Sequence, residues 1–214
     1  MIQIGLYEML SIFARGLQET VKLIPLCLLI SIAGGVLLGI IRSYRVPIID
    51  QILYLYIIFM RGIPPLIVLY IVFFLARLRS PFLAAIIGLS VYHIAYVSEI
   101  VRGGILAVPK GQFEAAKAVA LTSVQTMVLV ILPQIWYAIV PALAGQFIIL
   151  IKDTALVSVI GARTILWAGQ QIMNLTGKPF VPYLLVGFTY YILCSLTAAS
   201  GRMIERRFER KGVR

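Results

Sequence analysis

A short polar stretch separates two long apolar runs near the middle of the chain: Val108-Pro109-Lys110-Gly111-Gln112-Phe113-Glu114-Ala115-Ala116-Lys117-Ala118-Val119-Ala120-Leu121. Pro109 and Gly111 disfavour a continuous helix through its first residues, whereas Phe113 to Leu121 are good helix formers. Glu114 then falls in the first turn, where the helix dipole stabilises a carboxylate. Such a helix is too short to cross a bilayer of about 30 Å at about 1.5 Å per residue. We therefore expect it to lie at a membrane surface or to dock into another protein.

The composition is that of an integral membrane protein. Of the 214 residues, 61% are hydrophobic and 13% are charged, and the mean hydropathy is +1.01, which leaves too little polar surface for a soluble globule. The net charge of +11 would suit nucleic acid, but the basic residues flank apolar runs, where anionic lipid head groups attract them. Nucleic acid is therefore not expected as a partner. Cys27 and Cys194 lie within apolar runs and are expected to be packing residues.

Five apolar segments are long enough to cross a bilayer: residues 23–41, 52–76, 82–101, 124–151 and 179–201. Residues 1–20 show apolar positions at roughly helical spacing, which predicts an amphipathic helix along the membrane interface. Gly34, Gly35 and Gly39 lie near one face of the first span, where small residues allow another helix to approach closely. Residues 155–173 could form a sixth span, but their polar residues argue against it. We expect a short helix there that dips into the membrane or lies flat.

The distribution of basic residues favours five spans over six. With five spans, 11 of the 19 Lys and Arg residues fall on the side that holds the polar loop 108–122 and the basic tail 202–214, and seven fall on the other side. Because cytoplasmic loops carry an excess of Lys and Arg, we expect the N-terminus outside and the C-terminus in the cytoplasm. The whole chain, residues 1–214, is thus expected to be a single all-α transmembrane domain.

Polar residues inside the spans mark candidate functional positions. The segment Arg61-Gly62-Ile63-Pro64-Pro65 breaks the second span, because adjacent prolines remove two backbone donors, and an arginine at mid-membrane costs about 2.5 to 3.5 kcal/mol. A purely structural role for Arg61 remains open. His93, the only histidine in the sequence, has no partner at metal-ligand spacing and is expected to be a hydrogen-bonded core residue.

Several of these segments resemble one protein family. Glu114-Ala115-Ala116 and Ile131-Leu132-Pro133 resemble the cytoplasmic loop of the permease subunits of binding-protein-dependent ABC importers. The Arg61 segment and Lys152-Asp153-Thr154-Ala155-Leu156 resemble polar amino-acid permeases of the histidine, glutamine and arginine type. At Ala120 the family usually has Gly, which would allow a left-handed turn between two short helices that Ala disfavours. The resemblance covers residues 20 to 170 and implies the transmembrane domain of a type I ABC importer, with about five spans and a short coupling helix.

The resemblance also implies partners and site residues. Two permease subunits, identical or different, would form the pathway in a bacterial cell membrane, two separate ATPase subunits would bind ATP and Mg²⁺, and an external binding protein would deliver an amino acid. The implied ATPase-coupling residues are Lys110, Gly111, Glu114, Ala115, Ala116 and Ala120. The implied substrate-pathway residues are Arg61, Glu99, Arg102, Asp153, Thr154 and Ser158. The sequence contains no phosphate-binding loop and no catalytic or metal-binding constellation, so this chain is not expected to be an enzyme or to bind a cofactor.

Glu99 and Asp153 are expected within the membrane or at its edge, and each needs a cation because a buried, unpaired carboxylate is costly. Arg102 can reach Glu99 at i, i+3 and Lys152 neighbours Asp153, so purely structural pairing is one alternative. If the carboxylates face the pathway instead, they would hold the ammonium or basic side chain of an amino acid, while Arg61 or free amides at the broken helix take its carboxylate.

Two other classes of membrane protein are alternatives. An ion-coupled secondary transporter or channel could use Arg61 and Glu99 as relay groups, but the small size and the absence of an internal repeat weigh against it. A membrane-embedded enzyme is disfavoured because His, Asp and Cys are not clustered in the sequence. Co-purification of an ATPase with this chain would support the hypothesis of an importer subunit and neither of the other two.

Overall fold

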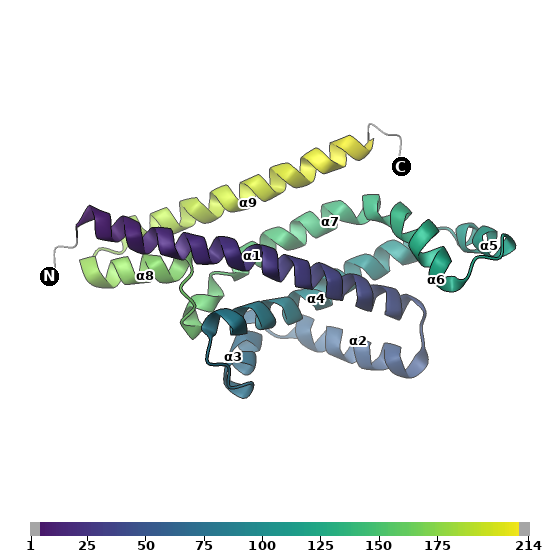
Figure 1. Ribbon diagram of the computed structural model, residues 1–214, viewed down its shortest axis with the longest axis horizontal. Coiled ribbons are helices and arrows are strands. Elements are labelled where there is room, and N and C mark those ends of the chain that lie inside the picture. The colour runs from purple at the N-terminus through teal and green to yellow at the C-terminus, as the bar shows by residue number, and fades with distance from the viewer. Residues whose placement is uncertain (1–4, 210–214) are drawn as a thin grey trace.

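A computed structural model of the chain describes residues 5–209. Within that range it consists of helices and contains no strand. The long helices α1 (Leu6–Ser43), α4 (Pro81–Ala107), α7 (Leu132–Asp153) and α9 (Phe180–Glu209) run roughly along one direction, with the N- and C-terminal ends at opposite ends of the molecule (Figure 1). The expected all-α architecture is confirmed. Of the expected basic tail, residues 202–209 continue α9, and residues 210–214 lie outside the described range.

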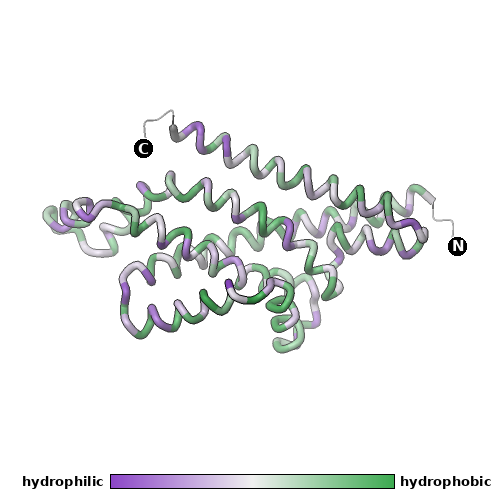
Figure 2. The backbone as a smooth tube through the Cα atoms, turned by 180° about the vertical axis from the view of Figure 1, so that it is seen from behind, coloured by the Kyte–Doolittle hydropathy of each residue, from purple (hydrophilic) through white to green (hydrophobic). Residues whose placement is uncertain are grey.

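Four helical segments are long and apolar enough to cross a membrane: Leu6–Ser43, Pro81–Ala107, Ser123–Ile160 and Phe180–Arg207. A bent pair of shorter helices makes up to five. Many large apolar side chains on these segments are exposed, including Leu29 at 67% and Phe188 at 60%, a surface that suits lipid and not water. Hydrophilic residues gather at the tip of the bundle and at the end of α9 (Figure 2). The chain is therefore a multi-pass membrane protein.

The bent pair consists of α2 (Pro47–Gly62) and α3 (Pro65–Leu75), whose axes differ by 111°. Ile63 is extended, at φ −115° and ψ 151°, because a residue that precedes proline avoids the helical region. Pro65 then starts α3, where its missing N–H group needs no partner. The predicted break in the second span is confirmed, but the turn is far sharper than a proline kink.

Of the expected interfacial helix over residues 1–20, residues 1–4 lie outside the described range, and from residue 6 onward the segment is the start of a longer helix. Residues 6–43 form one unbroken helix of 38 residues, about 57 Å long at 1.5 Å per residue. Its first half packs on α8 (Ile165–Thr176), where the Thr20 hydroxyl oxygen accepts a hydrogen bond of 3.0 Å from the Ile165 N–H group. Gly16 approaches the Thr164 carbonyl oxygen so closely that a Cβ atom would lie 2.8 Å from it. Packing on α8 therefore continues the helix beyond its apolar segment.

Close packing of α1 on α4 depends on the predicted glycine face. A Cβ atom at Gly35 would lie 2.4 Å from Val97, and one at Gly39 would lie 2.8 Å from the Ser98 carbonyl oxygen. The helices can approach to this distance because glycine has no side chain. The prediction that these glycines admit a second helix is confirmed. Helix α4 is the centre of the fold, since it also packs on α2, α3 and α7.

The second half of the chain begins with α5 (Lys110–Ala118), α6 (Ser123–Gln125) and a π-helical segment η1 (Thr126–Ile131) that leads into α7. Pro133 explains the π segment: its ring would clash with the carbonyl four residues earlier, so the chain widens and Leu132 donates to Met127, five residues back. After α7 follow the 3₁₀ segment η2 (Leu156–Ile160) and α8. Helix α8 has 12 residues, too few for the sixth span that the charge distribution had also argued against.

Candidate functional site

Helix α5 stands at one end of the bundle, between the end of α4 and the start of α6 (Figure 1). It begins at Lys110, three residues earlier than expected, because Pro109 can precede a helix in an extended conformation and the first-turn position of Gly111 carries little cost. Glu114 is therefore the fifth residue of α5, and the first turn contains no acidic residue. The expectation that the helix dipole stabilises Glu114 in the first turn is wrong.

Most of α5 is exposed, and it contacts the bundle through Phe113 and through Gln112, whose Oε1 atom accepts a hydrogen bond of 3.3 Å from Nε2 of Gln134 in α7. Five of the six predicted coupling residues are exposed, and Ala116 is buried at 4% exposure. Phe113 packs against the apolar cluster that includes Met127 and Ile131 of η1. Within residues 5–207, Glu114 forms no hydrogen bond or ion pair through its side chain. Its carboxylate is thus directed to the surface of the molecule.

The end of α5 is a Schellman motif with Ala120 in the left-handed position. Ala120 has φ +59°, the Leu121 N–H group donates to the Ala116 carbonyl at 3.0 Å, and the Ala120 N–H group donates to the Lys117 carbonyl at 2.9 Å. Although alanine disfavours this conformation, the two hydrogen bonds and the burial of Ala116 hold it. The chain therefore forms the turn that the sequence, with Ala in place of Gly, had argued against.

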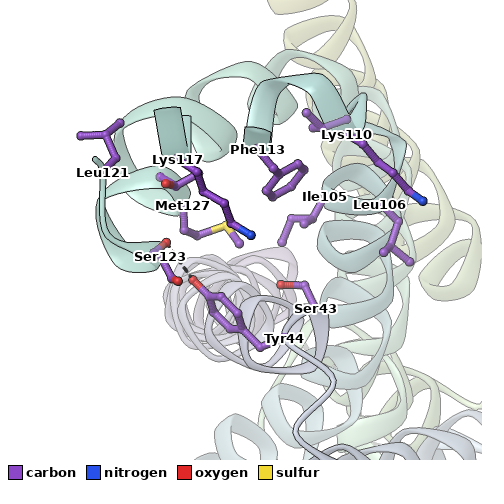
Figure 3. A pocket seen from close by; sticks show the side chains of 12 residues that line it. Ser43, Tyr44, Ile105, Leu106, Lys110, Phe113, Lys117, Leu121, Ser123 and Met127 are labelled. Atoms are coloured by element: carbon purple, nitrogen blue, oxygen red, sulfur yellow. Dashed lines mark hydrogen bonds between the residues drawn. The ribbon is translucent and has the colours of Figure 1, made fainter. Parts of the chain in front are cut away.

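A pocket of about 400 Å³ separates α5 from the end of α1. Its walls include Tyr44, which directly follows α1, Ile105 of α4, Phe113 and Lys117 of α5, and Met127 of η1, with the Lys117 side chain reaching over it (Figure 3). The Tyr44 hydroxyl closes one side by donating to the Ser123 carbonyl at 3.1 Å. Helix α5 is consequently supported on its η1 side and has open space toward α1.

A network of four charges joins α1, α2 and α4. Arg42, with 6% of its side chain exposed, donates to Asp50 at 2.9 Å and to Glu99, and its guanidinium also lies over the Tyr54 ring at 5.4 Å. Arg102 donates to both oxygens of Glu99, at 3.0 and 2.8 Å. Two cations thus balance two carboxylates. Because Glu99 already has two guanidinium partners, its contacts support the structural alternative and not the expected pathway role of Glu99 and Arg102.

A second polar group lies between α4 and α7. His93 has no exposed surface, and its Nδ1 atom is 2.8 Å from the Nε2 atom of Gln146. Its Nε2 atom is 3.2 Å from Oδ2 of Asp153, although the two atoms are not aligned as a hydrogen bond. The hydroxyl oxygens of Tyr92 and Tyr96, on the same helix, are hydrogen-bonded at 3.0 Å. The prediction of a hydrogen-bonded core histidine is confirmed, and Asp153 pairs with His93 instead of its neighbour Lys152.

The other predicted pathway residues differ in their contacts. Arg61 is exposed at the end of α2, and its guanidinium lies over the Tyr96 ring at 5.5 Å. It forms no ion pair with any other residue in the described part of the chain. Thr154 donates to the Ile151 carbonyl at 2.6 Å and meets the Tyr190 hydroxyl at 3.1 Å, and Ser158 donates to the Ala155 carbonyl at 2.8 Å. Both hydroxyls therefore serve contacts within the chain.

Sequence reasoning did not predict the roles of Arg42 and Asp50 in the charge network. It also did not predict the polar residues near His93, which are Gln146, Tyr92 and Tyr96. Arg42 was assigned to the boundary of the first span, because nothing local reveals a partner 57 positions away. Gln146 carried a usable signal, since it is a polar residue within an otherwise uncharged apolar span. Tyr92 and Tyr96 are four residues apart, the spacing of one helix face, and they flank His93.

Comparisons with known proteins agree with this geometry. Residues 31–210 match the family of binding-protein-dependent transport system inner membrane components. The L-cystine transport system permease protein TcyB of Bacillus subtilis is 35% identical, over 93% of this chain and 87% of the relative. The arginine ABC transporter permease protein ArtQ of Haemophilus influenzae is 28% identical, over 97% and 99%. A chain in the crystal structure of an amino acid ABC transporter superimposes with a TM-score of 0.83 at 30% identity, covering 96% of this chain and 100% of that one.

The fold is accordingly that of the transmembrane domain of type I ABC importers. The family is one of transport permeases and not of nucleotide-binding domains. The family match covers most of the chain, including both charged groups and α5. This chain belongs to the family of binding-protein-dependent transport system inner membrane components.

Proposed function

We propose that this chain is one of two permease subunits that form the pathway of an ATP-driven importer of polar or basic amino acids in a bacterial cell membrane. The names of its relatives, permeases for cystine and arginine, support an amino acid as the substrate. The second subunit is either another copy or a different chain. Separate ATPase subunits hold ATP and Mg²⁺, and an external binding protein delivers the substrate.

The observation that carries the proposal is the exposed polar helix α5 at one end of an otherwise apolar bundle. A helix of nine residues contributes nothing to crossing the membrane, and its face with Glu114 and Ala115 is free for a partner. The small side chain of Ala115 keeps this face of α5 narrow enough to enter a groove on the ATPase. We place α5 and the C-terminus in the cytoplasm and the N-terminus outside, because the basic residues are concentrated at the α5 end.

Coupling follows from the connections of α5. When the ATPase subunits close, α5 moves as a rigid body and pulls on α4 before it and on η1 and α7 after it. The π segment η1 is a natural place for bending, because helices commonly kink at π segments. The motion reaches the middle of the membrane through α4 and α7 and opens the pathway alternately to either side.

For the substrate, we propose that Arg61 takes the α-carboxylate and Asp153 the α-ammonium. Arg61 is exposed at a helix break and has its guanidinium on Tyr96, with no carboxylate of the described chain paired to it. Asp153 is 17% exposed and uses Oδ2 toward His93, which leaves Oδ1 for a cation. Thr154 and Ser158 support the end of α7 through their internal hydrogen bonds. Glu99 and Arg102 are not part of this site, because they are paired with each other.

The test is Glu114→Arg in the assembled complex. We expect the variant to reach the membrane but to lose substrate-stimulated ATP hydrolysis, because the reversed charge opposes docking of α5. Glu205→Arg, at an exposed glutamate of α9, is the matched control and should leave hydrolysis unchanged. Full coupling in Glu114→Arg, or a tagged wild-type chain that brings down no ATPase, would refute the assignment. The alternative of an ion-coupled transporter predicts uptake without any ATPase, and the pairing of Glu99 removes the relay group it needed.

A further inference from the structure

The pocket between α5 and the end of α1 lies where three membrane-crossing segments end. Ser43 is the last residue of α1, Leu106 is in the last turn of α4, and Ser123 begins the segment that continues into α7; all three line the pocket. The pocket is therefore at the depth where lipid head groups meet the hydrocarbon. Tyr44, which forms another wall and is 43% exposed, is an aromatic residue of the kind enriched at this depth.

The mouth of the pocket is positively charged. Lys110 and Lys117 of α5 line it, and none of its 12 lining residues is acidic. In Figure 3 the Lys117 side chain reaches over the pocket, and Lys110 lies at the edge toward Leu106. Glu114, one turn from both lysines, does not line the pocket, and neither lysine forms an ion pair within residues 5–207. Two cations without a carboxylate attract an anion to this opening.

The interior of the pocket is apolar. Ile105 and Met127 are buried at 3% and 4% exposure, and Phe113 packs beside them. A small hydrated anion would leave these walls against water, whereas a hydrocarbon chain would cover them. Leu106 lines the same pocket and is 48% exposed, so apolar surface continues from the interior to the outside of α4. The volume of about 400 Å³ is within the range of ligand pockets.

The pocket and the face proposed for the ATPase are on different sides of α5. Lys110, Phe113 and Lys117 are at positions i, i+3 and i+7, which share one side of a helix. Gly111 and Ala115, four residues apart, lie on the other side and are exposed. A soluble subunit on that second side does not enter the pocket. The occupant is therefore expected to come from the membrane.

We propose that this pocket binds one anionic phospholipid from the leaflet at the α5 end, with its phosphate at Lys110 and Lys117. One acyl chain lies against Ile105, Phe113 and Met127 and fills the open space between α5 and α1. Basic pockets between spanning helices bind anionic head groups in this way. The proposal goes beyond the proposed function and does not depend on it, because the chain meets lipid whether or not it imports an amino acid.

The first test is the affinity of the full-length chain for phosphatidylglycerol, measured by native mass spectrometry from detergent. Phosphatidylcholine with the same acyl chains has no net charge, and glycerol 3-phosphate supplies the phosphate without the chains. We expect phosphatidylglycerol to bind at least tenfold more tightly than phosphatidylcholine and at least a hundredfold more tightly than glycerol 3-phosphate. Equal affinity for the two lipids would overturn the proposal. Equal affinity for glycerol 3-phosphate would also overturn it, because the ligand would then be a free phosphate.

The second test locates the site. Lys110→Gln and Lys117→Gln should each lower the affinity for phosphatidylglycerol about fivefold and together about 25-fold, the scale of one basic residue near an anionic membrane surface. The control combines Arg202→Gln and Arg206→Gln, at exposed positions of α9 at the same end of the molecule, and should change the affinity by less than about twofold. An equal loss in the control would mean diffuse attraction to the basic surface and would overturn the site.

The same measurement on the assembled complex separates lipid from protein as the occupant. We expect phosphatidylglycerol to stay bound when ATPase subunits join the chain, because they meet the other side of α5. Displacement of the lipid by those subunits would assign the pocket to protein docking and overturn the proposal.

Discussion

At the scale of single residues, Arg42 is the point on which three helices converge. It lies at the end of α1, yet it holds Asp50 at the start of α2 and Glu99 of α4. Such a group is useful because the planar guanidinium presents several donors in a fixed geometry, so one side chain serves two carboxylates. Arg102 supplies the second cation, and no net charge remains in the network.

Arg42→Leu should lower the free energy of unfolding by about 2 to 3 kcal/mol. Removal of one partner from a fully buried ion pair costs about 3 to 5 kcal/mol, and the partial exposure of Asp50 and Glu99 reduces that cost. Arg42→Lys should recover part of the loss, since lysine restores the positive charge but not the planar set of donors that binds two carboxylates. The measurement is thermal unfolding in detergent. The control Arg45→Leu, at an exposed neighbour, should change stability by less than about 0.5 kcal/mol, and an equal loss there would contradict the role of Arg42.

At the scale of elements, α5 owes its position to how it begins and ends. Pro109 separates it from α4, and the Schellman motif at Ala120 reverses the chain toward α6. The motif satisfies the last carbonyls of α5 without any contact from outside the loop. The helix can therefore move as a unit, with Phe113 packed against η1 and Gln112 hydrogen-bonded to Gln134 of α7.

Ala120→Gly should stabilise the protein by about 0.5 to 1 kcal/mol. Relief of the left-handed conformation gains about 1 to 2 kcal/mol, and the extra freedom of glycine in the unfolded chain offsets part of it. Ala115→Gly, five residues earlier at an exposed position inside α5, should have the opposite sign and cost about 1 kcal/mol. Chemical denaturation of the two variants provides the comparison. Destabilisation by both would show that the turn at Ala120 does not need a left-handed residue.

At the scale of the whole molecule, the four long helices and the bent pair α2–α3 place α5 and the end of α9 at one end and the N-terminal end at the other (Figure 1). An odd number of crossings is required for this arrangement. Helix α8 packs alongside the first half of α1 and does not add a crossing, because it is only 12 residues long.

Single cysteines in a background without Cys27 and Cys194 should confirm five crossings. We expect cytoplasmic reactivity at positions 111 and 214 and external reactivity at positions 79 and 178, because the positive-inside rule places the α5 end in the cytoplasm. The measurement is labelling by a membrane-impermeant maleimide in intact cells and in inverted vesicles. External labelling at position 214 would mean an even number of spans and would contradict the topology.

The apolar segments by themselves indicated which parts of the chain are long and apolar enough to cross a membrane, because a stretch of about 20 apolar residues has no other stable environment. The break before Pro65, the existence of a short helix near Glu114 and the burial of His93 were also predicted. Each depends on local covalent or solvation properties: the lost donor of a proline, the helix propensity of alanine, the cost of burying a polar group.

Only the tertiary structure decided the rest. The 111° turn between α2 and α3, the continuation of α1 along α8 and the left-handed Ala120 each require packing that overrides local preference. Glu99 lies 57 positions from Arg42 in the sequence, and Gln146 lies 53 positions from His93. Hydrophobic periodicity and helix propensity carry information on neighbours within a few residues. The partner of a buried charge is instead decided by which distant residue the fold brings next to it. For Asp153 that residue is His93, whose Nε2 atom is 3.2 Å away.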